Sequence, residues 1–266
     1  MPLINEKGNK DMKKVLSLIL LCATLATFLV GCGGCISTIG VGYHSVVSAT
    51  DAEGEKNGKG NVVYTVAAVI LDVFGRVAEC RIDVADIKME YTSSGEALPK
   101  SEFLTKRQMG DAYDMFNDGL MWYEQATVFE RLAVGKNIDG IRSMVAEGGG
   151  GNGRVVNAGC TITVSDFALA VEDAIKNATT PVAYDSGLGL AISTSVEKLV
   201  SANGDKNGEI KLLTDVKAVF YTGEETSAYF GGSFTCGFAF DKNGGAKTDV
   251  PGAVTKKGFT VVTVGI

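Results

Sequence analysis

The sequence is poor in the residues that build most metal and acid–base sites. It has one histidine, His44, among 266 residues. Because imidazole is the commonest metal ligand and a frequent general base, one histidine excludes a multi-histidine metal site and gives a Ser-His-Asp hydrolase little support. Proline is also scarce, with 4 residues against 34 glycines, a balance that favours turns and hairpins over rigid linkers.

An excess of positive charge is missing too. The chain holds 25 Lys and Arg against 31 Asp and Glu, a formal net charge of -6. Neutralising a phosphate backbone takes clustered Lys and Arg, so nucleic acid is not expected as a partner. The hydrophobic content of 45% is that of a globular protein, and the length allows one large domain or two small ones.

The N-terminus carries the most specific pattern. Lys13 and Lys14 precede an uncharged apolar run at residues 15–30, which is followed by Gly31 and Cys32. A basic segment, a short apolar segment and a small residue before the cleavage point are typical of a secretory signal peptide. The sequence Leu-Val-Gly-Cys at 29–32 resembles a bacterial lipobox, which implies that Cys32 receives diacylglycerol and becomes the mature N-terminus.

We therefore expect residues 1–31 to be a lipoprotein signal peptide. The mature protein would lie at the extracytoplasmic face of the cell membrane, with the lipid on Cys32 as its link to the membrane. The alternative is a short transmembrane anchor, but the apolar run is shorter than the ~20 residues that such a helix needs. Residues 1–11 are interpreted as an upstream extension ahead of Met12.

Six cysteines are present, of which Cys22 lies in the predicted signal and Cys32 is the predicted lipid site. The other four are Cys35, Cys80, Cys160 and Cys236. They form no C-x-x-C pair in the folded body, so a zinc or iron–sulfur site is not expected. Export permits disulfides among them without fixing the pairs. Strand cysteines usually behave as small buried hydrophobes, and we favour this interpretation over a redox role for Cys80 and Cys160.

The first part of the mature chain has the pattern of a β-hairpin. Residues 32–60 are small and polar and are expected to form a tether. Residues 62–71 and 76–84 are strand-like, and the Asp-Val-Phe-Gly sequence at 72–75 predicts a turn between them. Residues 86–106 are polar and are expected to form a loop.

Helix patterns follow the hairpin. Residues 120–133 place apolar side chains every three to four positions, which predicts one buried helix face. Asn137 is expected to cap a short helix. After the glycine-rich loop at 147–153, residues 155–164 are predicted as a strand, and Ser165 is predicted as the N-cap of an amphipathic helix.

The chain then repeats itself in part. Three pairs of short segments share an offset of 150 residues: 55–58 with 205–208, 68–69 with 218–219, and 105–106 with 255–256. The sequences AECRIDV and FTCGFAFD are also alike, which pairs Cys80 with Cys236. We therefore expect an internal duplication, with residues 185–266 as a partial, β-rich second copy packed against the first.

One segment of the first copy resembles a known family. Residues 158–164 read Ala-Gly-Cys-Thr-Ile-Thr-Val, and an Ala-Val-x-x-Ala helix pattern follows from Ala170. This is similar to the signature Ser-Gly-Ala-Thr-x-Thr-Ser of the extracytoplasmic FMN-binding domain, which occurs in flavin-carrying surface lipoproteins. The matching residues are Gly159, Thr161 and Thr163, and the differing ones are Ala158, Cys160 and Val164.

The resemblance covers about residues 60–178 and implies an α+β domain, with antiparallel hairpins and packed helices, over residues 61–184. It implies FMN as the cofactor, with Gly159 and Thr161 at its phosphate end and Thr163 as an accessory donor. Thr161 would either carry FMN through a phosphoester bond or donate a hydrogen bond to it. A glycine lets the backbone approach a ligand, and a helix N-terminus favours a phosphate. The protein would then be an electron carrier with redox partners at the membrane, rather than an enzyme.

A second interpretation keeps the fold without the cofactor. Thr161 and Thr163 are then exposed strand residues before an ordinary helix, and the protein is a structural or interaction lipoprotein. Trp122 and Tyr123 could stack on a flavin ring, but they fit a helix core better. No general acid–base pair stands out. Three acidic residues near one another are interpreted as a solvated face rather than as a metal site: Asp111, Asp114 and Asp118.

Overall fold

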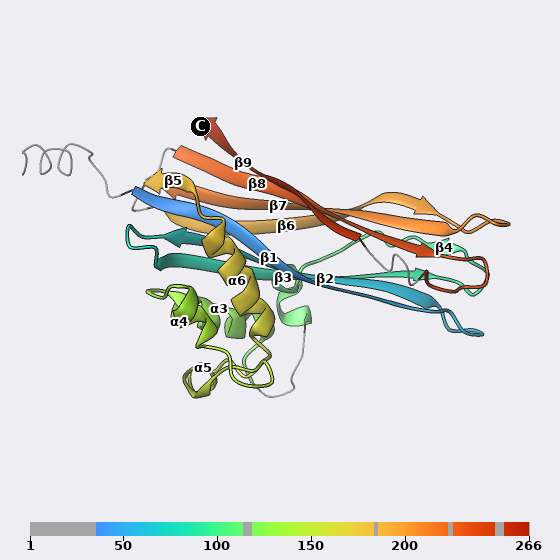
Figure 1. The fold of residues 1–266 in the computed structure, drawn as a ribbon, viewed down its shortest axis with the longest axis horizontal. Helices are drawn as coiled ribbons and strands as arrows, with labels where there is room; N and C mark the ends of the chain where they lie inside the picture. The colour runs from blue at the N-terminus through green and yellow to red at the C-terminus, as the bar shows by residue number, and fades with distance from the viewer. Residues whose placement is uncertain (1–35, 114–118, 184–185, 223–225, 248–252, 266) are drawn as a thin grey trace, which may run out of the picture. The chain divides into compact units, whose positions relative to one another are not determined.

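The computed structural model describes residues 36–113, 119–183, 186–222, 226–247 and 253–265, which belong to one unit of the chain. In these residues the chain forms two antiparallel sheets and a small group of helices (Figure 1). The protein is therefore of the α+β, sheet-rich class that the sequence predicted. Cys32, the predicted lipid site, and two of the acidic residues, Asp114 and Asp118, lie outside the described residues.

The first sheet has the strand order β4-β3-β2-β1-β5. Its strands are β1 (Ile36–Thr50), β2 (Gly58–Leu71), β3 (Val77–Tyr91), β4 (Ala97–Leu98) and β5 (Thr180–Ala183). The second half of β2 is buried at every position, because the second sheet covers one of its faces and helices cover the other.

The second sheet has the order β6-β7-β8-β9. Its strands are β6 (Gly187–Val200), β7 (Gly208–Thr222), β8 (Thr226–Phe240) and β9 (Ala253–Gly265). One hydrophobic core joins the two sheets, and its large members include Tyr64 and Tyr91 of the first sheet and Phe234 and Phe240 of the second. The C-terminal segment is thus β-rich and packs against the first sheet, as expected.

Helices cover only the outer face of the first sheet (Figure 1). They are α2 (Lys106–Met109), η1 (Gly110–Ala112), α3 (Trp122–Ala133), α4 (Ile138–Arg142), α5 (Gly153–Asn157) and α6 (Ser165–Lys176). Two predictions are confirmed here: α3 has one buried face, and the Asn137 side chain caps α4 by accepting a hydrogen bond from the N–H of Gly140.

Helix α6 lies directly on β1, where two glycines allow the close approach. A Cβ atom at Gly40 would stand 2.1 Å from the carbonyl oxygen of Ala174, and one at Gly42 would stand 2.0 Å from the nitrogen of Ala174. Between and beside them, Ile39 and Val41 are fully buried. The expected tether over 32–60 is therefore wrong from residue 36 onward, since the small residues of β1 are there for packing and not for flexibility.

Side chains of α6 and of the segment after it close one edge of the first sheet. Strand β5 pairs with only the first residues of β1, so the backbone further along β1 lacks a neighbouring strand on that side. There the Asp173 carboxylate accepts a hydrogen bond from the N–H of Tyr43 at 2.9 Å, and the Asn177 amide donates one to the carbonyl of Val41 at 3.1 Å. These two side chains make the backbone hydrogen bonds that a neighbouring strand would otherwise make.

The opposite edge is closed in the same way. Strand β4 pairs only with the end of β3, and at Ile82 two side chains take the place of a partner strand. The Glu130 carboxylate accepts a hydrogen bond from the N–H of Ile82 at 2.6 Å, and the Arg107 guanidinium donates one to its carbonyl at 2.6 Å. Arg107 and Glu130 also form an ion pair, and burial raises the pKa of Glu130. Both edges are thus protected against pairing with another chain.

The two sheets contain equivalent hairpins. The β1–β2 turn closes through a backbone bridge between Glu53 and Lys56, and the β6–β7 turn closes through one between Asn203 and Lys206, 150 residues later. Each turn has a glycine with positive φ at the same place, 59° at position 54 and 58° at position 204. The 150-residue offset therefore has a geometric counterpart in these turns.

The equivalent parts also meet each other. The N–H of Ala52 donates to the carbonyl of Gly244, and the N–H of Ala202 donates to that of Gly95, both at 2.7 Å. Between these contacts the rings of Tyr91 and Phe240 stack, with centroids 4.2 Å apart. The β1–β2 turn thus contacts the segment after β8, and the β6–β7 turn contacts the segment after β3.

Strand register corrects two of the sequence matches. Cys236 lies opposite Leu212, whose counterpart Val62 lies opposite Ile87, so Cys236 corresponds to Ile87 and not to Cys80. The segments at 105–106 and 255–256 also differ, because the first caps and begins α2 whereas the second lies in β9. The sequence match compared residue types alone, whereas the strand register shows which residues of the two sheets occupy equivalent positions.

Two secondary-structure predictions are also wrong. Residues 155–164 do not form a strand: the Asn152 side chain accepts hydrogen bonds from two N–H groups and so begins α5 just before Val155. Residues 86–91, expected as a loop, continue β3, because Ile87 and Met89 point into the core between the sheets. A local cap thus decides the first case, and in the second tertiary packing overrides a weak local pattern.

Candidate functional site

The predicted site residues lie on the connection between α5 and α6. Gly159, with φ at 104°, turns the chain away from the end of α5. From there the side chains alternate: Cys160 and Ile162 are buried, whereas Thr161 and Thr163 are exposed. Thr163 forms a backbone bridge with Gly150 of the glycine-rich loop. The structure therefore brings the three predicted residues onto one short connection, with both hydroxyl-bearing side chains at the surface.

The donors of this connection are directed at Gln125 of α3. The side-chain oxygen of Gln125 accepts hydrogen bonds from the N–H of Thr161 at 2.8 Å, from the Thr161 hydroxyl at 3.2 Å and from the N–H of Ile162 at 3.2 Å. The Gln125 amide nitrogen donates to the carbonyl of Leu120 at 2.8 Å, and its side chain is buried. Gln125 thus fastens the connection to α3 and takes the place that a phosphate oxygen would need.

The start of α6 is occupied as well. The carbonyl of Gly149 accepts hydrogen bonds from the N–H groups of Val164 and Ser165 at 2.9 and 3.0 Å. Val164, not Ser165, is the N-cap residue, and its side chain makes no capping hydrogen bond. Asp166 adds a carboxylate in the first turn, which already balances the positive end of the helix dipole. The start of α6 is therefore a weaker site for an anion than the sequence suggested.

A small cavity lies beside the connection. Its volume is about 190 Å³, and its walls are Val63, Thr65, Val84, Lys106, Trp122, Ile162, Thr163, Asp166 and Phe167. Pockets that bury a drug-sized ligand usually measure ~300–1,000 Å³. Together with the engaged donors, this size does not fit an FMN whose phosphate is held at Gly159 and Thr161 and whose ring enters the protein.

Trp122 belongs to the core, as favoured from the sequence. It is 3% exposed, and its ring packs edge-on against Phe167 with centroids 5.7 Å apart. The Tyr123 hydroxyl donates to the carboxylate of Asp111 at 3.0 Å on the surface. The two aromatic residues therefore point to different environments and do not form one stacking platform. In the described part of the chain, no three His, Cys, Asp or Glu side chains gather as metal ligands would.

The three cysteines of the described residues, Cys80, Cys160 and Cys236, are free and buried. Burial raises the pKa of Cys160 and of Cys236 to about 11, and it raises that of Cys80 well above its usual range. Because the thiolate is the reactive form, these cysteines are poor nucleophiles and poor redox centres. They serve as small apolar residues of the two cores.

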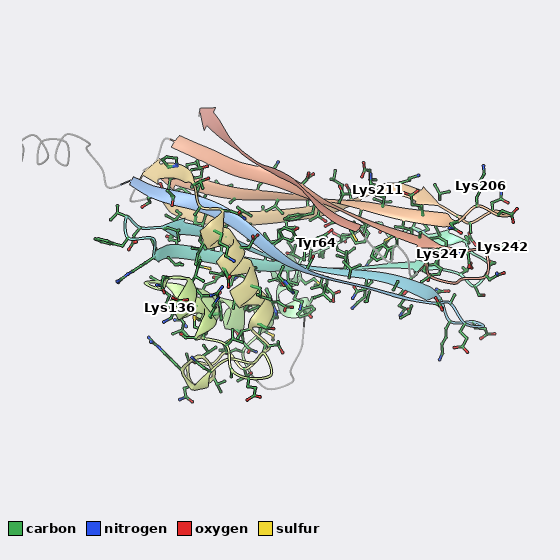
Figure 2. All side chains as sticks on the ribbon, viewed as in Figure 1. Tyr64, Lys136, Lys206, Lys211, Lys242 and Lys247 are labelled. Carbon is green, nitrogen blue, oxygen red and sulfur yellow. The ribbon has the colours of Figure 1, made fainter. Side chains whose placement is uncertain are left out.

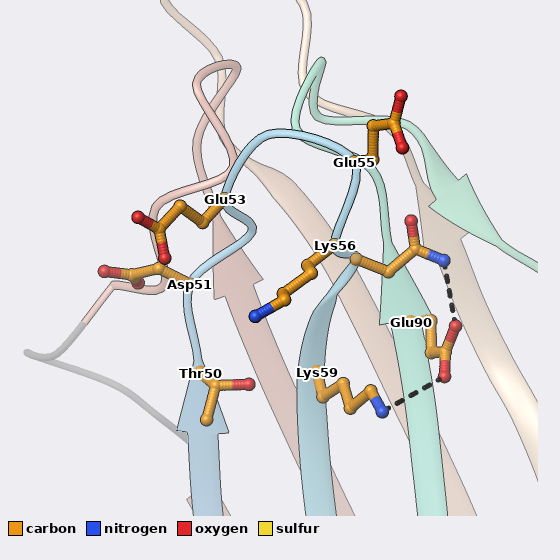
Figure 3. A pocket seen from close by; sticks show the side chains of 8 residues that line it. Thr50, Asp51, Glu53, Glu55, Lys56, Lys59 and Glu90 are labelled. Atoms are coloured by element: carbon orange, nitrogen blue, oxygen red, sulfur yellow. Dashed lines mark hydrogen bonds and ion pairs between the residues drawn. The ribbon is translucent and has the colours of Figure 1, made fainter.

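A larger hollow lies at the β1–β2 turn (Figure 3). It measures about 490 Å³ and is lined by Thr50, Asp51, Glu53, Glu55, Lys56, Asn57, Lys59 and Glu90. Its groups already pair with one another: Glu90 accepts a hydrogen bond from the Asn57 amide at 2.9 Å and lies 3.8 Å from the Lys59 ammonium. The hollow is open and polar, and its four carboxylates outnumber the two ammonium groups of Lys56 and Lys59. No arrangement of these groups selects a ligand.

Sequence reasoning missed Gln125, because a glutamine on a helix gives no signal of what it will bind. It placed Val73 and Phe74 in a turn, where they lie and are exposed, but it assigned them no role. A role for these two residues could have been suspected from the sequence, since two large apolar residues in a β-hairpin turn are unusual.

No family model, curated protein or solved structure matches this chain. Among the helices of the described residues, none combines the length and the apolar character needed to cross a bilayer.

Proposed function

We propose that the chain is an extracytoplasmic protein, lipid-anchored to the cell membrane through Cys32, that serves as a non-catalytic binding or interaction module. The lipobox-like sequence before Cys32 supports the anchor. The observation that favours an interaction module over a flavin carrier is the contact of Gln125 with the Thr161 connection, which uses the donors on which cofactor binding would depend. The buried cysteines support the same conclusion.

A second candidate is an electron carrier with FMN bound covalently. The exposure of Thr161 favours it, because a surface hydroxyl is open to a modifying transferase. In this alternative the resemblance to the FMN-binding domain family extends over residues 61–184, and Thr161 bears the flavin phosphate outside the protein core. The flavin supplies the electron chemistry, and the chain supplies the attachment point.

One expression experiment separates the two candidates. The full chain is produced in cells that also contain a flavin transferase, and the purified protein is examined by intact mass and visible absorbance. We expect a colourless protein without the FMN mass increment. A yellow protein that carries the increment, loses it in Thr161→Val and keeps it in the control Thr163→Val would replace the first candidate with the second.

The anchor is tested by Cys32→Ala. The wild-type protein should be found in the membrane fraction with a diacylglycerol increment in mass, and the variant should lose both. Unchanged membrane association of the variant would refute lipid anchoring at this residue.

We also propose that the two sheets arose by internal duplication of a three-stranded unit. The equivalent turns at 53–56 and 203–206 and their mutual contacts support it. If so, a chain in which the β6–β7 turn sequence replaces that of β1–β2 should fold with a thermal midpoint close to that of the wild type. Failure of the exchange to fold would count against equivalent ancestry of the turns.

A further inference from the structure

The β2–β3 turn, residues 72–76, holds two large apolar side chains out into solvent. The Asp72 carboxylate accepts hydrogen bonds from the N–H groups of Phe74 and Arg76, both at 2.9 Å, and Gly75 adopts a positive φ of 72°. In this fixed turn Phe74 is 81% exposed and Val73 is 51% exposed. A turn that only reverses the chain needs no such residues, so the exposure of Val73 and Phe74 indicates that this turn binds a partner.

Strand register places this turn at the end of the first sheet where the mature chain enters it. Thr38, two residues after the start of β1, lies opposite Leu71, the last residue of β2. Only three residues separate Cys32 from Ile36, and four extended steps cover at most ~14 Å. A lipid on Cys32 therefore keeps the bilayer within reach of the β2–β3 turn.

The surroundings of the turn have the chemistry of a membrane interface. The backbone of Val77 is hydrogen-bonded to Gly135 and Lys136, which brings the α3–α4 connection beside the turn. That connection adds Val134, another exposed apolar residue, and the basic side chain of Lys136 (Figure 2). With Arg76 in the turn itself, apolar and basic groups occur together, as they do in segments that rest on anionic lipid.

The opposite end of the two sheets is different. Its four turns, at 51–57, 92–96, 201–207 and 241–245, contain no large apolar residue in their sequences. They are rich in Asp, Glu, Lys, Asn and Ser, and Figure 1 shows them at the far ends of the strands from the start of β1. The β2–β3 turn therefore differs from these four turns in the way that a membrane-facing turn and water-facing turns should differ.

We propose that Val73 and Phe74 insert into the interfacial layer of the bilayer that holds the lipid of Cys32, so that the sheets stand with their polar turns away from the membrane. This proposal rests on the proposed lipid anchor. It adds a second contact with the membrane, and two contacts fix an orientation that one flexible anchor leaves free.

Tryptophan fluorescence tests the contact. The chain has one tryptophan, Trp122, which is 3% exposed and provides a constant background. Phe74→Trp places a reporter in the β2–β3 turn, and Glu55→Trp places a matched one in the β1–β2 turn at the other end of β2. Both proteins are expressed from the full chain, purified from cells and mixed with or reconstituted into vesicles of phosphatidylethanolamine and phosphatidylglycerol, with and without brominated acyl chains.

We expect the emission of the Phe74→Trp reporter to shift to shorter wavelength on vesicles and to be largely lost with brominated lipid, while that of the Glu55→Trp reporter stays unchanged. Equal behaviour of the two reporters, quenched or not, would overturn the insertion of the turn. Intact mass of the same samples decides the anchor separately: a missing diacylglycerol increment contradicts the proposed function, whereas the difference between the two reporters still decides the turn.

Discussion

The two sheets share their hairpin geometry but differ in what covers them. Thr65 and Ala67 of β2 are buried beneath the helices, whereas the equivalent residues of β7, Asp215 and Lys217, are exposed. In the second half of β2 every position is buried, while in β7 buried and exposed positions alternate from residue 214 to residue 218. The outward-facing residues thus decide whether a sheet of this geometry receives a helical layer or faces water.

The edges show the same contrast. The outer edge of β8 is covered by a full strand, β9, whereas β3 has the short β4 and the side chains of Glu130 and Arg107. After β3 and β4 the chain leaves the first sheet to build helices, whereas after β8 it stays in the second sheet as β9. The first sheet, which helices cover, therefore depends on specific side-chain contacts that the second sheet, the bare sheet, does not need. Substitutions at equivalent positions of the covered and the bare sheet should have unequal effects.

The largest difference is expected for glycine substitutions in the two first strands. Gly40 pairs with Val69 and Gly189 pairs with Val219, so the two glycines occupy equivalent positions. A Cβ at position 40 would overlap the backbone of α6, whereas one at position 189 meets only ordinary contacts at 3.8 Å. Gly40→Ala should lower the free energy of unfolding by about 3 kcal/mol or more, because neither backbone can yield easily.

Gly189→Ala is the matched control. It should leave the free energy of unfolding unchanged or raise it by up to ~1 kcal/mol, since alanine restricts the unfolded chain. Urea unfolding curves of both variants measure the effects. Equal losses would show that α6 does not pack on β1 as closely as the structure has it.

The second prediction removes an edge contact that only the covered sheet has. Glu130→Ala takes away the acceptor for the N–H of Ile82 and leaves the Arg107 guanidinium without its ion-pair partner. Breaking a buried ion pair from one side costs about 3 kcal/mol. Glu130→Gln keeps an acceptor at the same place and should lose less. Calorimetric unfolding of both variants gives the order, and a smaller loss for the alanine variant would contradict the role of the carboxylate.

How much of this was readable from sequence depends on what each residue contacts. The β2–β3 hairpin, the Asn137 cap and the offset between the turns follow local rules, and the sequence predicted them. Strand β1 did not, because Gly40 and Gly42 look like loop residues until α6 lies on them. Gly159 and Thr161 share one connection, but the acceptor for the donors of that connection is Gln125, which is 36 residues away in sequence from Thr161. No local pattern reports such a contact.

A smaller effect is expected where the two sheets meet. Tyr91 and Phe240 stack on each other, and they differ by the Tyr91 hydroxyl, which donates to the carbonyl of Thr50 at 2.7 Å. Tyr91→Phe makes the pair alike and removes this hydrogen bond, so the free energy of unfolding should fall by about 1 kcal/mol. Phe240→Leu, which removes the stack itself, should cost more. Chemical denaturation measures both, and an equal or larger loss for Tyr91→Phe would mean that the hydroxyl, not the stack, dominates.

The smallest effect concerns an ion cluster that holds the helical layer together. Glu172 of α6 accepts two hydrogen bonds from the Arg142 guanidinium of α4, at 2.9 and 2.6 Å, and one from the Lys176 ammonium at 2.6 Å. These bonds, with Arg142 first, lower the pKa of Glu172 from 4.5 to about 2. A carboxyl whose pKa is lower in the folded state stabilises the fold above its unfolded pKa and stops doing so as the pH falls through the folded value. The contribution should therefore be complete above pH ~5 and disappear between about pH 4.5 and 2.

Because both cations are more than half exposed, the cluster should add only about 1 kcal/mol or less. Glu172→Gln should lower the free energy of unfolding by that amount at pH 7, and the gap to the wild type should close toward pH 2. The matched control is Glu209→Gln on the bare sheet, where the carboxylate pairs with the single exposed cation of Lys198 and no helix depends on it. That variant should stay close to the wild type at pH 7. If the two variants show the same pH dependence in denaturant titrations, the cluster of Glu172 is an ordinary surface pair and the helical layer is held by its apolar contacts alone.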